Sequence, residues 1–74
     1  MECQPTSGAT IVVNGEARPM RSGETIESLL EAMEIEPSRV AVEVNRRIVK
    51  RSAWPQHVLD DGAQIEIVQF VGGG

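Results

Sequence analysis

Three stretches of the chain have the hydrophobic pattern of β-strands, and the first lies near the N-terminus. It is the β-branched run from Thr10 to Val13, which Asn14-Gly15 follows directly. Asparagine–glycine between apolar runs is the strongest short-range signal for a hairpin turn. We therefore expect a returning strand at residues 17–21, with Pro19 at a sheet edge or a bulge.

A second pattern has the apolar spacing of an α-helix. Thr25 suits the N-cap, and Glu27 places a negative charge in the first turn, where the helix dipole favours it. Pro37 requires the helix to have ended by Glu36. One apolar stripe would face a sheet, and it consists of Ile26, Leu29, Leu30 and Met33. The solvent side would carry Glu27, Ser28 and Glu31.

The second strand pattern runs from Val40 to Val44 and alternates with period two. It predicts that its three valines, at positions 40, 42 and 44, point into the core. Residues 45–47 would turn the chain into a short strand at 48–49, and Trp54-Pro55 would break regular structure.

The third strand pattern covers about residues 64–71 and follows a turn at Asp60-Asp61-Gly62. By parity, Ile65 and Ile67 would pack under the helix, while Val68 and Phe70 would point to the other face.

Phe70 has two interpretations of about equal weight. It packs against Trp54 as an extension of the core, or it is an exposed aromatic that anchors a partner. Exposed aromatics are enriched at binding hot spots, which is the basis of the second interpretation.

The predicted order of elements is β-β-α-β-β-β, which matches the α+β fold called β-grasp or ubiquitin-like. A mixed sheet of about five strands is expected, with the first and last strands parallel neighbours in its middle. The helix would cover one face of the sheet and leave the other open. We expect a disordered lead at residues 1–9, one domain at 10–71, and a flexible glycine tail at 72–74.

Composition excludes several classes of function. The 74-residue chain has a net charge of −4, which disfavours binding to nucleic acids or anionic membranes. A single cysteine, Cys3, forms no internal disulfide and is interpreted as incidental; with the single His57 it makes no metal site. No run reaches the roughly 18 apolar residues of a membrane span, and no signal peptide is recognised. The expected location is the reducing cytoplasm.

Four basic residues cluster in this acidic chain. They are Arg46, Arg47, Lys50 and Arg51. The favoured interpretation is a solvated turn, and the other is a contact with an acidic patch on a partner. His57 has no neighbouring groups that make a catalytic arrangement and is taken as a surface residue.

Three glycines, at positions 72, 73 and 74, follow the last strand pattern. Glycine has no Cβ, so such an arm passes through a narrow slot and leaves its terminal carboxylate uncrowded. An enzyme that activates a carboxylate needs such a substrate. A frayed chain end is the alternative interpretation.

In this order of elements, residues 10–74 resemble the ThiS family, the sulfur carrier proteins of thiamine thiazole synthesis. The most specific part of the resemblance is Ile48-Val49, Arg51 and Trp54 in register with Phe70-Val71-Gly72-Gly73-Gly74. Weaker matches are Val13-Asn14-Gly15, Gly23-Glu24-Thr25-Ile26, Val40 to Asn45, and Leu59-Asp60-Asp61-Gly62.

The resemblance implies a protein-bound substrate that has no catalytic residues and no bound cofactor. A ubiquitin-activating-type adenylyltransferase would use ATP to adenylate the Gly74 carboxylate. A sulfur donor, such as a cysteine desulfurase route, would convert the adenylate to a thiocarboxylate for thiazole synthase. Gly72 and Gly73 would be recognised in the tail. The candidates for partner docking are Phe70, Val68, Arg51 and Trp54.

Two rival functions keep the same fold. The chain carries sulfur in another pathway, such as molybdopterin or tungsten cofactor synthesis, or it is a protein-interaction or modifier domain. Lys50 is the only lysine, which argues against a modifier that builds chains of itself.

Overall fold

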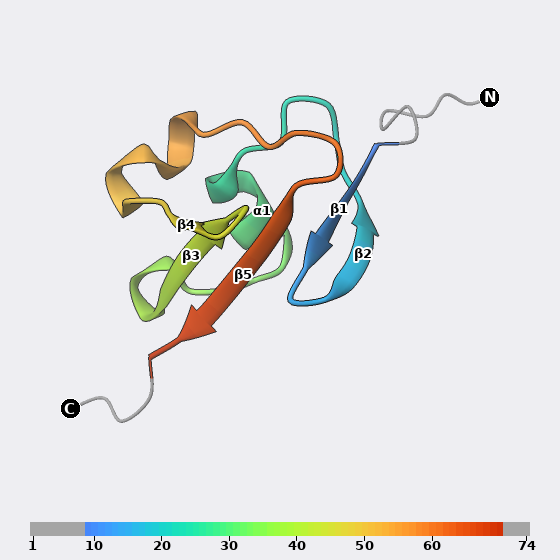
Figure 1. The fold of residues 1–74 in the computed structure, drawn as a ribbon. Coiled ribbons are helices and arrows are strands. Elements are labelled where there is room, and N and C mark those ends of the chain that lie inside the picture. Colours follow the sequence, from blue (N-terminus) through green and yellow to red (C-terminus); the bar gives the residue numbers. More distant parts are fainter. Residues whose placement is uncertain (1–8, 71–74) are drawn as a thin grey trace.

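The computed structural model describes residues 9–70, so most of the predicted lead and the whole glycine tail lie outside the described residues. Figure 1 shows strands and helices in the predicted order. Their bounds are β1 Thr10–Val13, β2 Glu16–Pro19, α1 Ile26–Ala32, η1 Pro37–Arg39, β3 Val40–Val44, β4 Arg47–Ile48, η2 Arg51–Gln56 and β5 Gln64–Gln69, where η marks a 3-10 helix.

The five strands form one mixed sheet in the order β2-β1-β5-β3-β4 (Figure 1). β1 and β5 are parallel neighbours, whereas the other pairs are antiparallel. The prediction that the first and last strands lie side by side inside the sheet is confirmed. β5 is the central strand, and the chain leaves the sheet from its end.

A single core fills the space between the sheet and α1. Ile26, Leu29 and Leu30 are the buried residues of α1, as the apolar stripe predicts. The sheet contributes Ile11, Val13, Val40, Val42, Val44 and Ile65. Fully burying one such side chain stabilises a fold by about 1.5–3 kcal/mol, so this layer fixes the orientation of α1 on the sheet. Met33 and Ile67 pack against the core from its edge.

Two tight turns set the registers at the ends of the sheet. Asn14 and Gly15 have φ angles of 50° and 85°, in the left-handed region that a type I′ hairpin requires. Asn45 and Arg46 repeat this conformation, with φ angles of 52° and 71°. The second turn therefore places Arg47 opposite Val44. For this reason β4 is Arg47–Ile48, one residue earlier than predicted, and β2 likewise starts directly after its turn.

The N-terminus of α1 is capped as the sequence predicts, with one difference. Ser28 N–H donates to Thr25 Oγ1 at 3.1 Å, and Thr25 N–H donates to Ser28 Oγ at 2.9 Å. Ser28 Oγ–H also donates to the buried carboxylate of Glu24 at 2.6 Å. Ser28 is therefore half-buried in a capping box, and its placement on the solvent side of the helix was wrong.

A carboxylate joins the turn before β5 to the start of β1. Asp61 Oδ1 accepts a hydrogen bond of 2.9 Å from the backbone N–H of Thr10. β5 itself ends at Gln69, two residues before the predicted end. No helix within residues 9–70 has the length and hydropathy that a membrane crossing requires.

Candidate functional site

The candidate site is the C-terminal end of β5, where the chain leaves the sheet toward the glycine tail. On one side β3 pairs with β5 through to Val40 opposite Gln69. The backbone N–H of Phe70 then donates to the carbonyl of Arg39 at 2.9 Å. Backbone hydrogen bonds therefore fix this side of the strand as far as Phe70, the last described residue.

The other side of β5 is held by a side chain. β1 ends at Val13, but the Asn14 side chain continues its hydrogen bonding along β5. Ile67 N–H donates to Asn14 Oδ1 at 2.8 Å, and Asn14 Nδ2 donates to the Ile67 carbonyl at 3.3 Å. The side-chain amide of Asn14 thus makes the two hydrogen bonds that the backbone of a longer β1 would make.

Asn45 acts similarly at the start of β5. Its Oδ1 accepts a 3.0 Å hydrogen bond from Gln64 N–H, and its own backbone N–H donates to the Gln64 carbonyl at 2.7 Å. One asparagine from each hairpin turn therefore clamps the central strand. Both turns are predictable from the sequence, but these contacts are not, because they depend on residues about 20 or about 50 positions away.

The open face of the sheet carries two of the predicted docking residues. Val68 and Phe70 expose 54% and 58% of their surface, and Val68 lies opposite Ala41 of β3. These exposures agree with the interpretation of Phe70 as an exposed aromatic and not with its packing against Trp54.

Two carboxylates follow the apolar residues along the same face. Glu66 of β5 lies directly opposite Glu43 of β3, and Ile48 of β4 lies on the other side of Glu43. The open face is therefore apolar at the end where the chain leaves the sheet and negatively charged next to it. Such a surface is complementary to a partner that combines an apolar pocket with basic side chains.

The other two predicted docking residues lie in η2, which packs against α1 on the covered side of the sheet. Trp54 is only 4% exposed, and its Nε1–H donates to the Val49 carbonyl at 2.9 Å. The carbon of the Arg51 guanidinium lies 5.8 Å from the centre of the Trp54 ring. Trp54 is thus a core residue, which corrects its expected role as a docking contact, and Arg51 covers it from the solvent side.

Residues 9–70 contain no group of three or more His, Cys, Asp or Glu side chains that could hold a metal ion. What the described geometry provides is a rigid strand end beside an exposed apolar pair. Gly72, Gly73 and Gly74 lie outside the described residues.

Comparison with known proteins relates this arrangement to one family. The model of the ThiS family matches residues 11–74. The sulfur carrier protein ThiS of Escherichia coli is 36% identical over 64 residues, which cover 86% of this chain and 97% of that protein.

A solved structure has the same fold. The crystal structure of the thiamine biosynthesis protein ThiS from Geobacter metallireducens superposes with a TM-score of 0.74 at 29% identity. The match covers 88% of this chain and 99% of the other.

Longer proteins contain a similar segment. The thiazole synthase of Paramagnetospirillum magneticum is 42% identical over 64 residues, and the chain spans only 20% of its length. A second thiazole synthase, from Magnetococcus marinus, matches to the same extent. Since the family model covers nearly the whole chain, this protein belongs to the ThiS family.

Proposed function

We propose that this chain carries sulfur for the thiazole ring of thiamine as a thiocarboxylate on Gly74. As a member of the ThiS family it is a sulfur carrier of thiamine biosynthesis and not an enzyme. The observation that supports the proposed mechanism is the central strand β5, which is bonded on one side as far as Phe70, clamped on the other side at Ile67 by Asn14, and followed by the glycine tail.

The chemistry requires activation because a carboxylate resists attack by nucleophiles. A carboxylate oxygen of Gly74 would attack the α-phosphate of ATP, and pyrophosphate would leave. A sulfur nucleophile would then attack the carbonyl carbon of the adenylate and displace AMP. Hydrosulfide gives the thiocarboxylate directly, whereas a persulfide gives an acyl disulfide that a thiol must reduce. The carrier itself supplies only an accessible carbonyl group.

The reach of the tail suits this division of labour. Four residues follow Phe70, and they extend at most about 14 Å at 3.3–3.6 Å per residue. A partner that contacts the open face beside Val68 and Phe70 would therefore receive the terminal carbonyl inside its own active site. Glycine residues allow that arm to pass through a narrow channel.

The proposed partners follow from these steps. They are a ubiquitin-activating-type adenylyltransferase, a sulfur-transfer enzyme such as a cysteine desulfurase, and thiazole synthase. The similarity to a segment of two thiazole synthases supports association with the last of these. Glu43 and Glu66 lead us to expect basic side chains on the surfaces that dock on the open face.

Mass spectrometry of the intact protein tests the proposed function. The protein is incubated with ATP, the activating enzyme and a sulfur source, and a variant without Gly74 is the matched control. We expect the full chain to gain the mass difference between sulfur and oxygen, while the truncated variant stays unmodified. Equal modification of both proteins would place the sulfur elsewhere and contradict the proposal.

A further inference from the structure

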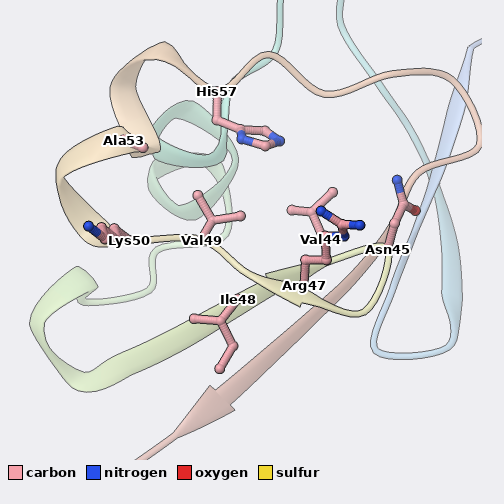
Figure 2. Close-up of a pocket in the computed structure, with 8 residues that line it drawn as sticks. All are labelled: Val44, Asn45, Arg47, Ile48, Val49, Lys50, Ala53 and His57. Atoms are coloured by element: carbon pink, nitrogen blue, oxygen red, sulfur yellow. The ribbon is translucent and has the colours of Figure 1, made fainter.

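A hollow of about 520 Å³ lies between the β3–β4 hairpin and η2, at the edge of the sheet that β4 forms. Figure 2 shows Val44, Arg47 and Val49 rising from the hairpin into this space, with His57 pointing into it from above. We call this hollow the η2 groove. Its lining residues are Val44, Asn45, Arg47, Ile48, Val49, Lys50, Ala53 and His57.

The floor of the η2 groove is apolar and held in place by hydrogen bonds. The Val49 carbonyl accepts a hydrogen bond from Trp54 Nε1–H at 2.9 Å, and Val49 N–H donates to the Val42 carbonyl at 3.0 Å. Ala53 N–H donates to the Lys50 carbonyl at 2.9 Å. Val49 and Ala53 are half-buried, whereas Ile48 at the lower edge in Figure 2 is 74% exposed. The floor is thus preformed and offers exposed aliphatic surface.

The rim of the η2 groove is positively charged. Arg47 and Lys50 line it, and Arg46 and Arg51 flank it in the sequence. These four residues are more than half of the seven lysines and arginines in a chain of net charge −4. No aspartate or glutamate occurs between positions 45 and 59.

The rim charges are not neutralised within the described part of the chain. Across residues 9–70, the structure shows no ion pair to the side chains of Arg46, Arg47 or Lys50. A purely solvated turn accounts for these charges but not for the preformed apolar floor beneath them.

We propose that the η2 groove binds an acidic segment of a partner protein, with one apolar side chain seated on Val49 and Ala53. Carboxylates that flank this side chain would pair with Arg47 and Lys50. A guanidinium group pairs with a carboxylate through two parallel hydrogen bonds, which gives the contact direction as well as attraction. Water expelled from the apolar floor would supply the rest of the binding free energy.

The η2 groove lies away from the place where the chain leaves the sheet. β4 pairs with the Val44 end of β3, whereas Gln69 lies opposite Val40 at the other end. The Arg47 end of the η2 groove is therefore four residue steps along β3 from Gln69, or roughly 13 Å, and the Val49 end, which hydrogen-bonds Val42, is two steps from it. Val68 and Phe70 lie at the central strand and point to the open face, and neither lines the η2 groove, so a segment bound there leaves them free. The inference is independent of the chemistry of Gly74, because it concerns binding without ATP or sulfur.

A nuclear magnetic resonance titration tests this inference. The isotope-labelled full chain is titrated with the synthetic peptide acetyl-Asp-Glu-Leu-Phe-Glu-Asp-amide. We expect saturable shifts at the backbone amides of residues 47–53 and 57. Replacing the acidic residues of the peptide with asparagine and glutamine, or raising the salt concentration, should weaken binding, because both reduce the charge attraction.

Charge variants of the protein locate the site. R47E combined with K50E should weaken peptide binding by about tenfold or more, since two attractive pairs become repulsive. R21E is the matched control, because Arg21 is exposed and does not line the η2 groove. The milder pair R47Q and K50Q should give a smaller loss, and unchanged amide spectra outside residues 45–57 would show that the fold is intact.

Four outcomes would overturn the inference. The first is the absence of saturable shifts, and the second is a shift pattern centred on Val68 and Phe70. The third is equal binding of the neutral peptide or of the R47E and K50E double variant. The fourth is competition by a single-stranded oligonucleotide. If the oligonucleotide bound the η2 groove more tightly than the peptide does, the groove would be a nucleic-acid site and the inference would be contradicted.

Discussion

The side-chain amide of Asn14 hydrogen-bonds both backbone polar groups of Ile67, at 2.8 Å and 3.3 Å. β1 is only four residues long, so without this contact β5 would lose its partner on that side after Ile65. The hairpin turn therefore has a second role besides reversing the chain. It steadies the part of β5 that leads to Phe70 and the glycine tail.

Replacing Asn14 with glycine should loosen β5 locally. Glycine keeps the positive φ angle that this position requires and removes only the amide, so N14G isolates the side-chain contacts. We expect the free energy of unfolding to fall by about 1–2 kcal/mol, because two hydrogen bonds are lost and a typical one contributes about 0.5–1.5 kcal/mol net. Hydrogen exchange at the Ile67 amide should accelerate. N45G is the control, and it should accelerate hydrogen exchange at the Gln64 amide instead. Unchanged protection of the Ile67 amide in N14G would show that Asn14 does not clamp β5.

Trp54 should stabilise the fold through its ring and through one hydrogen bond. W54F retains an aromatic ring but leaves the Val49 carbonyl without the Nε1–H donor. We expect a loss of about 1–3 kcal/mol in the free energy of unfolding, and a larger loss of about 3–5 kcal/mol for W54A. Denaturation followed by circular dichroism measures both variants. A stability equal to the wild type in W54A would show that Trp54 is not part of the core.

Phe70 should matter for partner binding and little for folding. Because its side chain is 58% exposed, F70A should change the free energy of unfolding by less than about 0.5 kcal/mol. Its affinity for the activating enzyme should fall by about tenfold or more, as expected for an aromatic anchor. V58A provides a control, because Val58 is similarly exposed but lies outside β5. Equal affinities for F70A, V58A and the wild type would remove Phe70 from the interface.

Removing the repulsion between the facing carboxylates of Glu43 and Glu66 should stabilise the fold. Like charges directly opposite each other on neighbouring strands repel, so E66K should raise the stability by about 0.2–1 kcal/mol at low salt. If partners present basic surfaces, the same variant should bind the activating enzyme more slowly. E16K serves as a control at an exposed site on β2. Faster association of E66K than of the wild type would show that the docking surface is not basic.

Local sequence signals predicted most of the fold because each element is encoded by its own residues. Asn14-Gly15 specified the first hairpin, and Thr25 specified the start of α1. The alternation from Val40 to Val44 correctly assigned the buried face of β3. These features depend on backbone conformation and on burial of one face, both of which a short window of sequence reveals.

Features that depend on distant neighbours were not predicted. The clamps made by Asn14 and Asn45 appear only once β5 lies between the two turns. Trp54 was assigned to a docking surface because its motif resembled the family, whereas packing against α1 buries it. The η2 groove forms from β3, β4 and η2 together, so the basic residues alone could not separate a solvated turn from a binding site.

Transfer of labelled sulfur tests the central claim most directly. The protein is loaded with an isotopic sulfur label in the presence of ATP and its activating enzyme, purified, and given to thiazole synthase with the remaining thiazole precursors. The account predicts that the label leaves Gly74 and appears in the thiazole product, while the carrier returns to a carboxylate. Label that remains on the protein while thiazole forms from another sulfur source would contradict it.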